Sequence, residues 1–60
     1  MSYYKQVSPK NEHPPKGENV FIVTIHESEA IGYYHVPEYW IRGFGYMRPE
    51  DILYWLKKID

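Results

Sequence analysis

The sequence contains no cysteine, which excludes disulfide bonds and thiolate metal sites. A chain of 60 residues buries only about 60% of its unfolded surface. Domains of this size often gain stability from disulfides, a metal or a partner subunit. Without cysteine, we expect either a marginally stable monomer or a homo-oligomer. The length allows a single domain, residues 1–60.

An excess of charge of one sign is also lacking, because seven Lys and Arg residues oppose eight Asp and Glu residues. The net charge of −1 gives no overall field that favours nucleic acid or an anionic membrane. The sequence has neither an apolar run of about 18 residues nor the cationic-then-apolar pattern of a signal peptide. We therefore expect a soluble, intracellular protein that does not bind membranes.

β-Branched and aromatic side chains are abundant, and the latter include seven Tyr, two Trp and two Phe. Residues 20–25 form a short apolar run bounded by turn signals, which predicts a central strand. Residues 30–36 predict its hairpin partner, with the turn at residues 27–30. In the expected register Val23 lies opposite Tyr34, and one wholly apolar face is buried. That face comprises Phe21, Val23, Ile25, Tyr34 and Val36. The other, mixed face comprises Val20, Ile22, Thr24, His26, Ile31, Tyr33 and His35.

Two further segments flank this hairpin, residues 20–36. Residues 3–7 allow a short edge strand, and the proline-rich residues 8–19 predict a rigid loop, since proline fixes its backbone and lacks a donor. Residues 39–47 predict a second hairpin with a tight turn at Arg42-Gly43. This register places Trp40 opposite Gly45 and Tyr39 opposite Tyr46.

The C-terminal segment has two interpretations. As a helix over residues 49–59, Pro49 is the first helical residue and the apolar residues form one stripe along the helix. As a turn followed by a strand, the apolar residues divide between two faces. One face then carries Leu53, Trp55 and Ile59, and the other carries Ile52, Tyr54 and Leu56. The local pattern by itself favours the helix.

Several short motifs also recur in a familiar order along the chain. They are Tyr4-Lys5-Gln6-Val7, Pro14-Pro15 before Val20-Phe21-Ile22-Val23, Ile31-Gly32-Tyr33-Tyr34, Trp40, and Asp51-Ile52-Leu53-Tyr54-Trp55-Leu56. In this order they resemble a family of small phage- and prophage-encoded proteins of unknown function. Members of that family have an aromatic-Ile-Ser-Val segment, a Leu-Pro pair before a Val-Leu-Val strand, a Gly-Trp/Tyr-Tyr strand and a closing Thr-His-Trp-Met-Pro-Leu-Pro segment.

The chain departs from the family pattern at its end, where Tyr54 replaces the family's His and Lys57-Lys58 replace its terminal prolines. The resemblance implies an extended C-terminal segment and a phage or bacterial cytoplasmic setting, and it brings no activity. We therefore expect a mainly β fold, a small antiparallel sheet of three to five short strands built on the hairpin of residues 20–36. The alternative is an α+β fold with a helix over residues 49–59.

Catalytic chemistry has little support in the residues. No glycine-rich phosphate loop or nucleophile elbow is present, and the serines lie in polar segments without an oriented base. In the expected register His26 and His35 lie about 13 Å apart, too far for a shared metal ion. We expect no catalytic residues, no metal and no cofactor, and hence no enzyme.

A protein-interaction module is the preferred function, because Tyr and Trp are enriched at binding hot spots. The partner would be a host protein or a second copy of the chain, as a homodimer. The candidate binding residues are Ile22, Ile31, Tyr33, His35, Tyr39, Trp40, Arg42 and Tyr46. The alternative is binding of single-stranded nucleic acid through aromatic stacking and Lys or Arg contacts. The balanced charge argues against this alternative.

Overall fold

The structure, a computed structural model, describes residues 3–59 of the chain. Over that range the chain forms strands joined by turns and loops, with one short 3₁₀ turn at Pro49–Asp51. The strands are β1 (Tyr4–Val7), β2 (Val20–Thr24), β3 (Glu29–His35), β4 (Glu38–Ile41), β5 (Gly45–Met47) and β6 (Ile52–Lys58). The expectation of a mainly β fold is confirmed, with six strands in the described range where three to five were expected.

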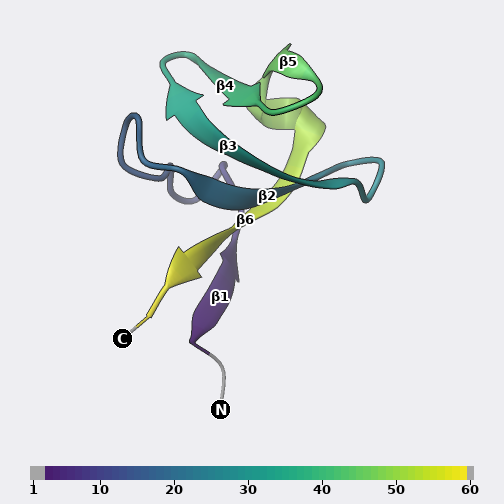
Figure 1. The fold of residues 1–60 in the computed structure, drawn as a ribbon. Helices are drawn as coiled ribbons and strands as arrows, with labels where there is room; N and C mark the ends of the chain where they lie inside the picture. Colours follow the sequence, from purple (N-terminus) through teal and green to yellow (C-terminus); the bar gives the residue numbers. More distant parts are fainter. Residues whose placement is uncertain (1–2, 60) are drawn as a thin grey trace.

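All six strands belong to one sheet, in the order β1-β6-β2-β3-β4-β5. Every neighbouring pair is antiparallel. Strands β2 to β5 follow one another as a meander, and β6 then inserts between β1 and β2. In Figure 1, β1 and the end of β6 extend together away from the rest of the sheet as an arm, while β4 and β5 lie at the opposite end.

The core lies on one face of this sheet. Paired residues of neighbouring strands share a face, and every second residue along a strand returns to it. On this basis Ile22 and Trp55, which pair directly, lie on the same face as Val7, and all three are buried. The core cluster consists of Val7, Ile22, Tyr39, Ile41, Ile52 and Trp55, with Val20, Ala30, Tyr34 and Met47 packed against it.

The register of the first hairpin differs from the expected one. Val23 pairs with Glu29 rather than with Tyr34, and Phe21 pairs with Ile31. Thr24 explains the difference, because its Oγ1 accepts hydrogen bonds from the backbone N–H groups of His26 and Ser28, both at 3.3 Å. These bonds hold the turn directly after Thr24, earlier than the expected turn at residues 27–30.

The new register reverses β2 relative to β3, because an odd shift in pairing places the side chains of one strand on the opposite face with respect to its partner. Ile22, expected on the mixed face, is completely buried, and Thr24 is 1% exposed. Phe21, expected in the core, is 50% exposed, and Ile25 and Val36 are also exposed. The prediction of the buried residues was therefore wrong for Phe21, Ile25 and Val36. It was right for Val23, which is buried, and for Tyr34, which packs against the core cluster.

The second hairpin joins β4 to β5 and is displaced by one residue from the expected pairing. Trp40 pairs with Tyr46 rather than with Gly45, and Tyr39 pairs with Met47 rather than with Tyr46. The turn contains one residue more than expected, since the N–H of Phe44 donates to the carbonyl of Ile41 at 2.9 Å. Gly43 and Gly45, with φ of 86° and 84°, adopt the left-handed conformation that this longer turn requires.

The C-terminal segment is a strand, and the helical alternative over residues 49–59 is wrong. A β-bulge explains why its pattern looked helical. Val23 pairs with Tyr54 and Thr24 pairs with Ile52, so Leu53 is an extra residue in β6. The extra residue lets Ile52 and Trp55 both face the core, although a regular strand would place them on opposite faces. Two buried apolar residues three positions apart, such as Ile52 and Trp55, are otherwise typical of a helix.

Candidate functional site

The proline-rich loop, residues 8–19, covers the core face of the sheet. The His13 ring stacks on Tyr34, with centroids 4.3 Å apart and planes 7° from parallel, and its Nδ1 lies 2.7 Å from the Tyr39 hydroxyl. Pro9 and Pro14, which belong to the loop, are buried. These contacts pack the loop against the core residues Tyr34 and Tyr39.

Two of the expected binding residues, Ile22 and Tyr39, belong to this covered face and have no exposed surface. Burial raises the pKa of the Tyr39 phenol above its ordinary value, and the neighbouring Tyr34 raises it further. Tyr39 is therefore a neutral hydrogen-bonding group of the core at physiological pH. A buried, protonated phenol of this kind is not available as a base or to contact a partner.

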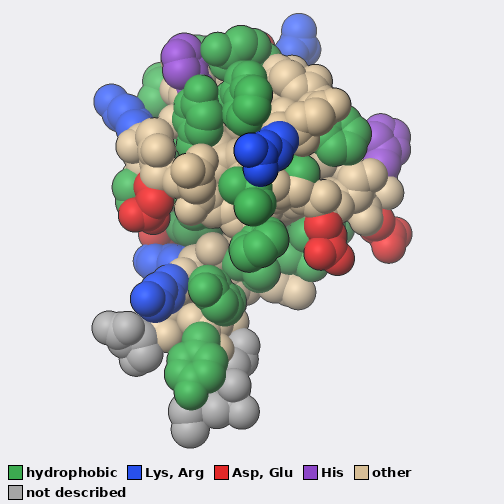
Figure 2. Space-filling view, in the orientation of Figure 1, with side chains coloured by type: hydrophobic (Ala, Val, Ile, Leu, Met, Phe, Trp, Pro, Cys, Tyr) green, Lys and Arg blue, Asp and Glu red, His purple; other side chains and the backbone are tan. Residues whose placement is uncertain are grey.

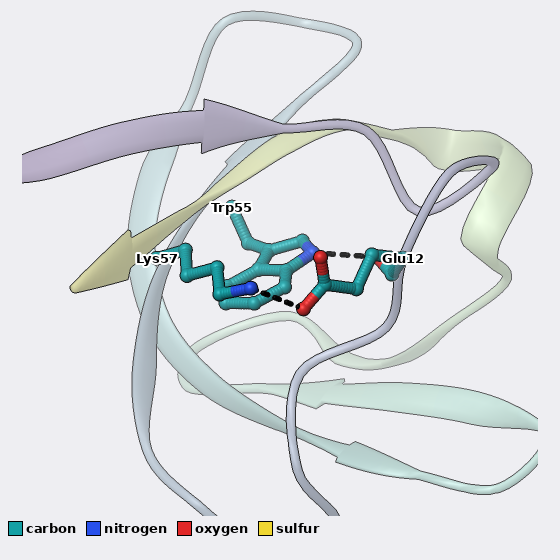
Figure 3. A network of polar contacts seen from close by, with 3 residues as sticks. All are labelled: Glu12, Trp55 and Lys57. Carbon is teal, nitrogen blue, oxygen red and sulfur yellow. Dashed lines mark hydrogen bonds and ion pairs between the residues drawn. The ribbon is translucent and has the colours of Figure 1, made fainter. Parts of the chain in front are cut away.

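A second anchor holds the loop to β6 (Figure 3). The Trp55 indole Nε1–H donates to the backbone carbonyl of Glu12 at 2.9 Å, and the Lys57 ammonium lies 2.7 Å from the Glu12 carboxylate. The carboxylate and the ammonium are both partly exposed, so this ion pair contributes little, in the range of about 0–1 kcal/mol. The indole hydrogen bond satisfies the one polar atom of an otherwise buried side chain.

The other face of the sheet carries four of the expected binding residues side by side, on β3, β4 and β5. Tyr33 and Trp40 pair across β3 and β4 and stack with ring centroids 5.5 Å apart. His35 meets Tyr46 edge-on, also at 5.5 Å, and Tyr46 pairs with Trp40. We call Tyr33, His35, Trp40 and Tyr46 the aromatic patch. The sequence identified all four members, and the strand pairing brings them together.

The patch continues onto β2 through one apolar pair. Ile31, an expected binding residue, pairs with Phe21, and both side chains are exposed on the same face as the patch. Phe21 was missed as a surface residue because the expected register placed it in the core. The signal that indicates otherwise is Thr24 shortly before the polar residues 26–29, a pattern typical of a turn stabilised by a threonine hydroxyl.

Arg42, the remaining expected binding residue, lies in the turn between β4 and β5. Its side chain is exposed, and its backbone N–H donates to the carbonyl of Ile31 at 2.9 Å. This bond fixes the turn beside Ile31, so Arg42 lies at the border of the patch face rather than within it.

The face of the sheet that carries the aromatic patch, here called the patch face, has charges of both signs. By strand pairing, Glu29 and Glu38 share this face with His35, and alternation along β6 adds Lys58. Figure 2 shows one side of the molecule, where hydrophobic side chains are interspersed with both signs of charge. The face therefore presents rings and aliphatic groups without the positive field that phosphate groups require.

No group of three His, Asp or Glu side chains within residues 3–59 is placed to hold a metal ion. The same part of the chain contains no helix long and apolar enough to span a membrane. The buried side-chain polar atoms described by the structure all have hydrogen-bond partners. The aromatic patch combines partial exposure with defined ring contacts, which makes it a candidate binding site.

The resemblance to phage-encoded proteins remains a prediction from short motifs. Comparison with protein-family models, with curated proteins and with solved structures gives no match for this chain.

Proposed function

We propose that this chain is a small non-enzymatic protein-interaction module that binds its partner through the aromatic patch. The observation that supports the proposal is a sheet face on which Tyr33 stacks with Trp40 and His35 meets Tyr46. His35 and Tyr46 are exposed, and Tyr33 and Trp40 are half-buried. Tyr and Trp offer large rigid contact areas and are the residues most enriched at protein-binding hot spots. Their mutual contacts hold the rings in place before binding, which lowers the entropic cost of association.

The partner is a protein with a complementary apolar surface, either a host protein or a second copy of this chain. Following the sequence resemblance, we propose a phage or prophage accessory protein that acts in the bacterial cytoplasm. Self-association has a physical motive as well. A second copy would cover apolar area that a chain of this size leaves exposed, including Phe21 and Ile31 at the edge of the patch.

The test compares two equally exposed aromatic residues. Tyr46, in the patch, is 56% exposed, and Phe44, in the adjacent turn and outside the ring contacts of the patch, is 54% exposed. Tyr46→Ala should weaken binding by about tenfold or more, as expected for a hot-spot residue, whereas Phe44→Ala should have little effect. Binding is measured by sedimentation for self-association and by pull-down from a bacterial lysate for a host protein.

Each variant is first checked for an unchanged melting temperature, so that loss of binding is not loss of folding. A monomeric wild-type protein that captures nothing would contradict the proposal. Equal effects of Tyr46→Ala and Phe44→Ala would also contradict it, since the patch would then have no special role.

The stacked pair of Tyr33 and Trp40 also supports a second candidate function, the binding of single-stranded nucleic acid. Exposed rings on an open sheet can stack bases irrespective of their sequence. Glu29 and Glu38 on the same face oppose this function by repelling phosphates. A labelled oligonucleotide titrated at several salt concentrations decides between the two. Phosphate contacts predict an affinity that falls steeply with salt, and a flat or absent response eliminates nucleic acid.

A further inference from the structure

A cleft separates β2 from the outer half of β6, residues 56–58. The pairing of these two strands ends at Ile22 and Trp55 within the described chain, although both strands continue beyond that point. A cavity of about 570 Å³ occupies the gap, in the size range typical of ligand sites. Residues from both sides line it, among them Glu18, Val20, Phe21, Ile31, Leu56 and Lys58.

The cleft exposes the backbone of β6. On the other side of β6, the N–H of Ile59 donates to the carbonyl of Tyr3 at 2.8 Å, within the pairing of β6 with β1. Backbone groups of successive strand residues point to opposite sides, so those of Lys58 point away from β1 and toward the cleft. In the described chain no strand pairs with Lys58 on that side. The outer half of β6 is therefore an open strand edge.

The side chains around the cleft define what it would accept. Phe21 and Ile31 are exposed and Leu56 is half-buried, and alternation places all three on the same face of the sheet as Lys58. The neighbouring Lys57 is already bound to Glu12, whereas no ion pair of Lys58 is found within residues 3–59. Glu18 lies on the opposite wall. Lys and Arg side chains gather where the β1–β6 arm joins the body (Figure 2).

We propose that the cleft binds an extended peptide segment of a partner protein, which adds as a strand along the outer half of β6. Strand addition uses main-chain hydrogen bonds for affinity and alternate side chains for specificity. An apolar peptide residue would lie beside Leu56, against Phe21 and Ile31, and an acidic residue two positions away would lie beside Lys58. This site shares Phe21 and Ile31 with the edge of the aromatic patch but uses none of the four rings of the patch, so it does not depend on them.

The experiment titrates isotope-labelled protein with a synthetic octapeptide and follows backbone amides by NMR. The peptide consists of threonines with one valine and, two residues from it, one glutamate. We expect saturable shifts at Phe21, Leu56 and Lys58, with no comparable change at Tyr46. Lys58→Glu should weaken binding by about fivefold or more, because it reverses one exposed charge, while Lys10→Glu in the loop should change it little. Tyr46→Ala should leave peptide binding intact even if it abolishes binding by the aromatic patch.

Three outcomes would overturn the proposal. Binding that survives N-methylation of the peptide backbone would exclude strand addition. Equal effects of Lys58→Glu and Lys10→Glu, or equal binding of a peptide with lysine in place of glutamate, would exclude the charge match. Shifts of the same amides with protein concentration alone, without peptide, would assign the cleft to a second copy of the chain.

Discussion

Gly32→Ala should be among the most damaging single-methyl changes in this protein. Gly32 lies in the middle of β3, between Val20 of β2 and Ile41 of β4, and is buried. A Cβ built at this position would overlap the backbone carbonyl oxygen of Trp40. It would also lie 3.1 Å from Ile22 Cδ1 and 3.1 Å from Ile41 Cα. Comfortable carbon–carbon contacts lie at about 3.5–4.0 Å, so the added methyl group has no room.

The size of the expected loss of stability depends on which atoms obstruct the added methyl group. Overpacking of a core costs about 1–3 kcal/mol and occasionally more, because side chains usually rotate aside. Two of the three obstructing atoms here belong to the backbone of β4, and relief would require β4 to move away from β3. We expect a loss of about 3 kcal/mol or more in the free energy of unfolding. The total for a domain of this length is only about 3–9 kcal/mol, so the variant should be mostly unfolded or close to it.

Urea unfolding followed by tryptophan fluorescence measures this loss, with Gly17→Ala as the matched control. A Cβ at Gly17 meets nothing within 4 Å, and only its φ of 76° opposes the substitution. That strain costs about 1–2 kcal/mol. If Gly32→Ala loses no more stability than Gly17→Ala, the close approach of β3 and β4 is wrong and the steric reasoning fails.

Two other changes test the assignment of the sheet faces and the core tyrosine. Ile22→Ala should lower the free energy of unfolding by about 2–5 kcal/mol, because Ile22 is completely buried, whereas Phe21→Ala should lower it by less than about 1 kcal/mol. If urea unfolding shows a larger loss for Phe21→Ala than for Ile22→Ala, the register expected from the sequence is correct and the observed one is wrong. Tyr39→Phe should cost about 1 kcal/mol at neutral pH, for the lost hydrogen bond to His13. Burial, with Tyr34, raises the folded-state pKa of Tyr39, so its protonated form stabilises the fold fully below the ordinary value of 10.0, and this contribution falls as the pH rises above it. Melting temperatures across that range should therefore drop more for the wild type than for Tyr39→Phe, and parallel curves would contradict the assigned burial.

The local sequence was sufficient to predict the strands, the loop and the turn that depend on a few consecutive residues. The β-branched runs predicted the strands of the central hairpin, the prolines predicted the loop of residues 8–19, and Gly43 indicated the turn between β4 and β5. Tyr33, His35, Trp40 and Tyr46 were chosen for their residue types, and they form one patch because they alternate correctly along adjacent strands. These features depend on backbone propensity and turn chemistry, which are properties of a few consecutive residues.

Tertiary structure alone decided which face is buried and what the C-terminal segment becomes. Both faces of β2 are largely apolar, so the pattern could not say that Ile22, rather than Phe21, enters the core. Ile52 and Trp55 have a helical spacing, and only pairing of β6 with β2 creates the bulge at Leu53 that puts both side chains in the core. The physical reason is the same in both cases. The side-chain direction in a strand is set by its register with a neighbour, and the neighbour of β6 lies some thirty residues away in the sequence.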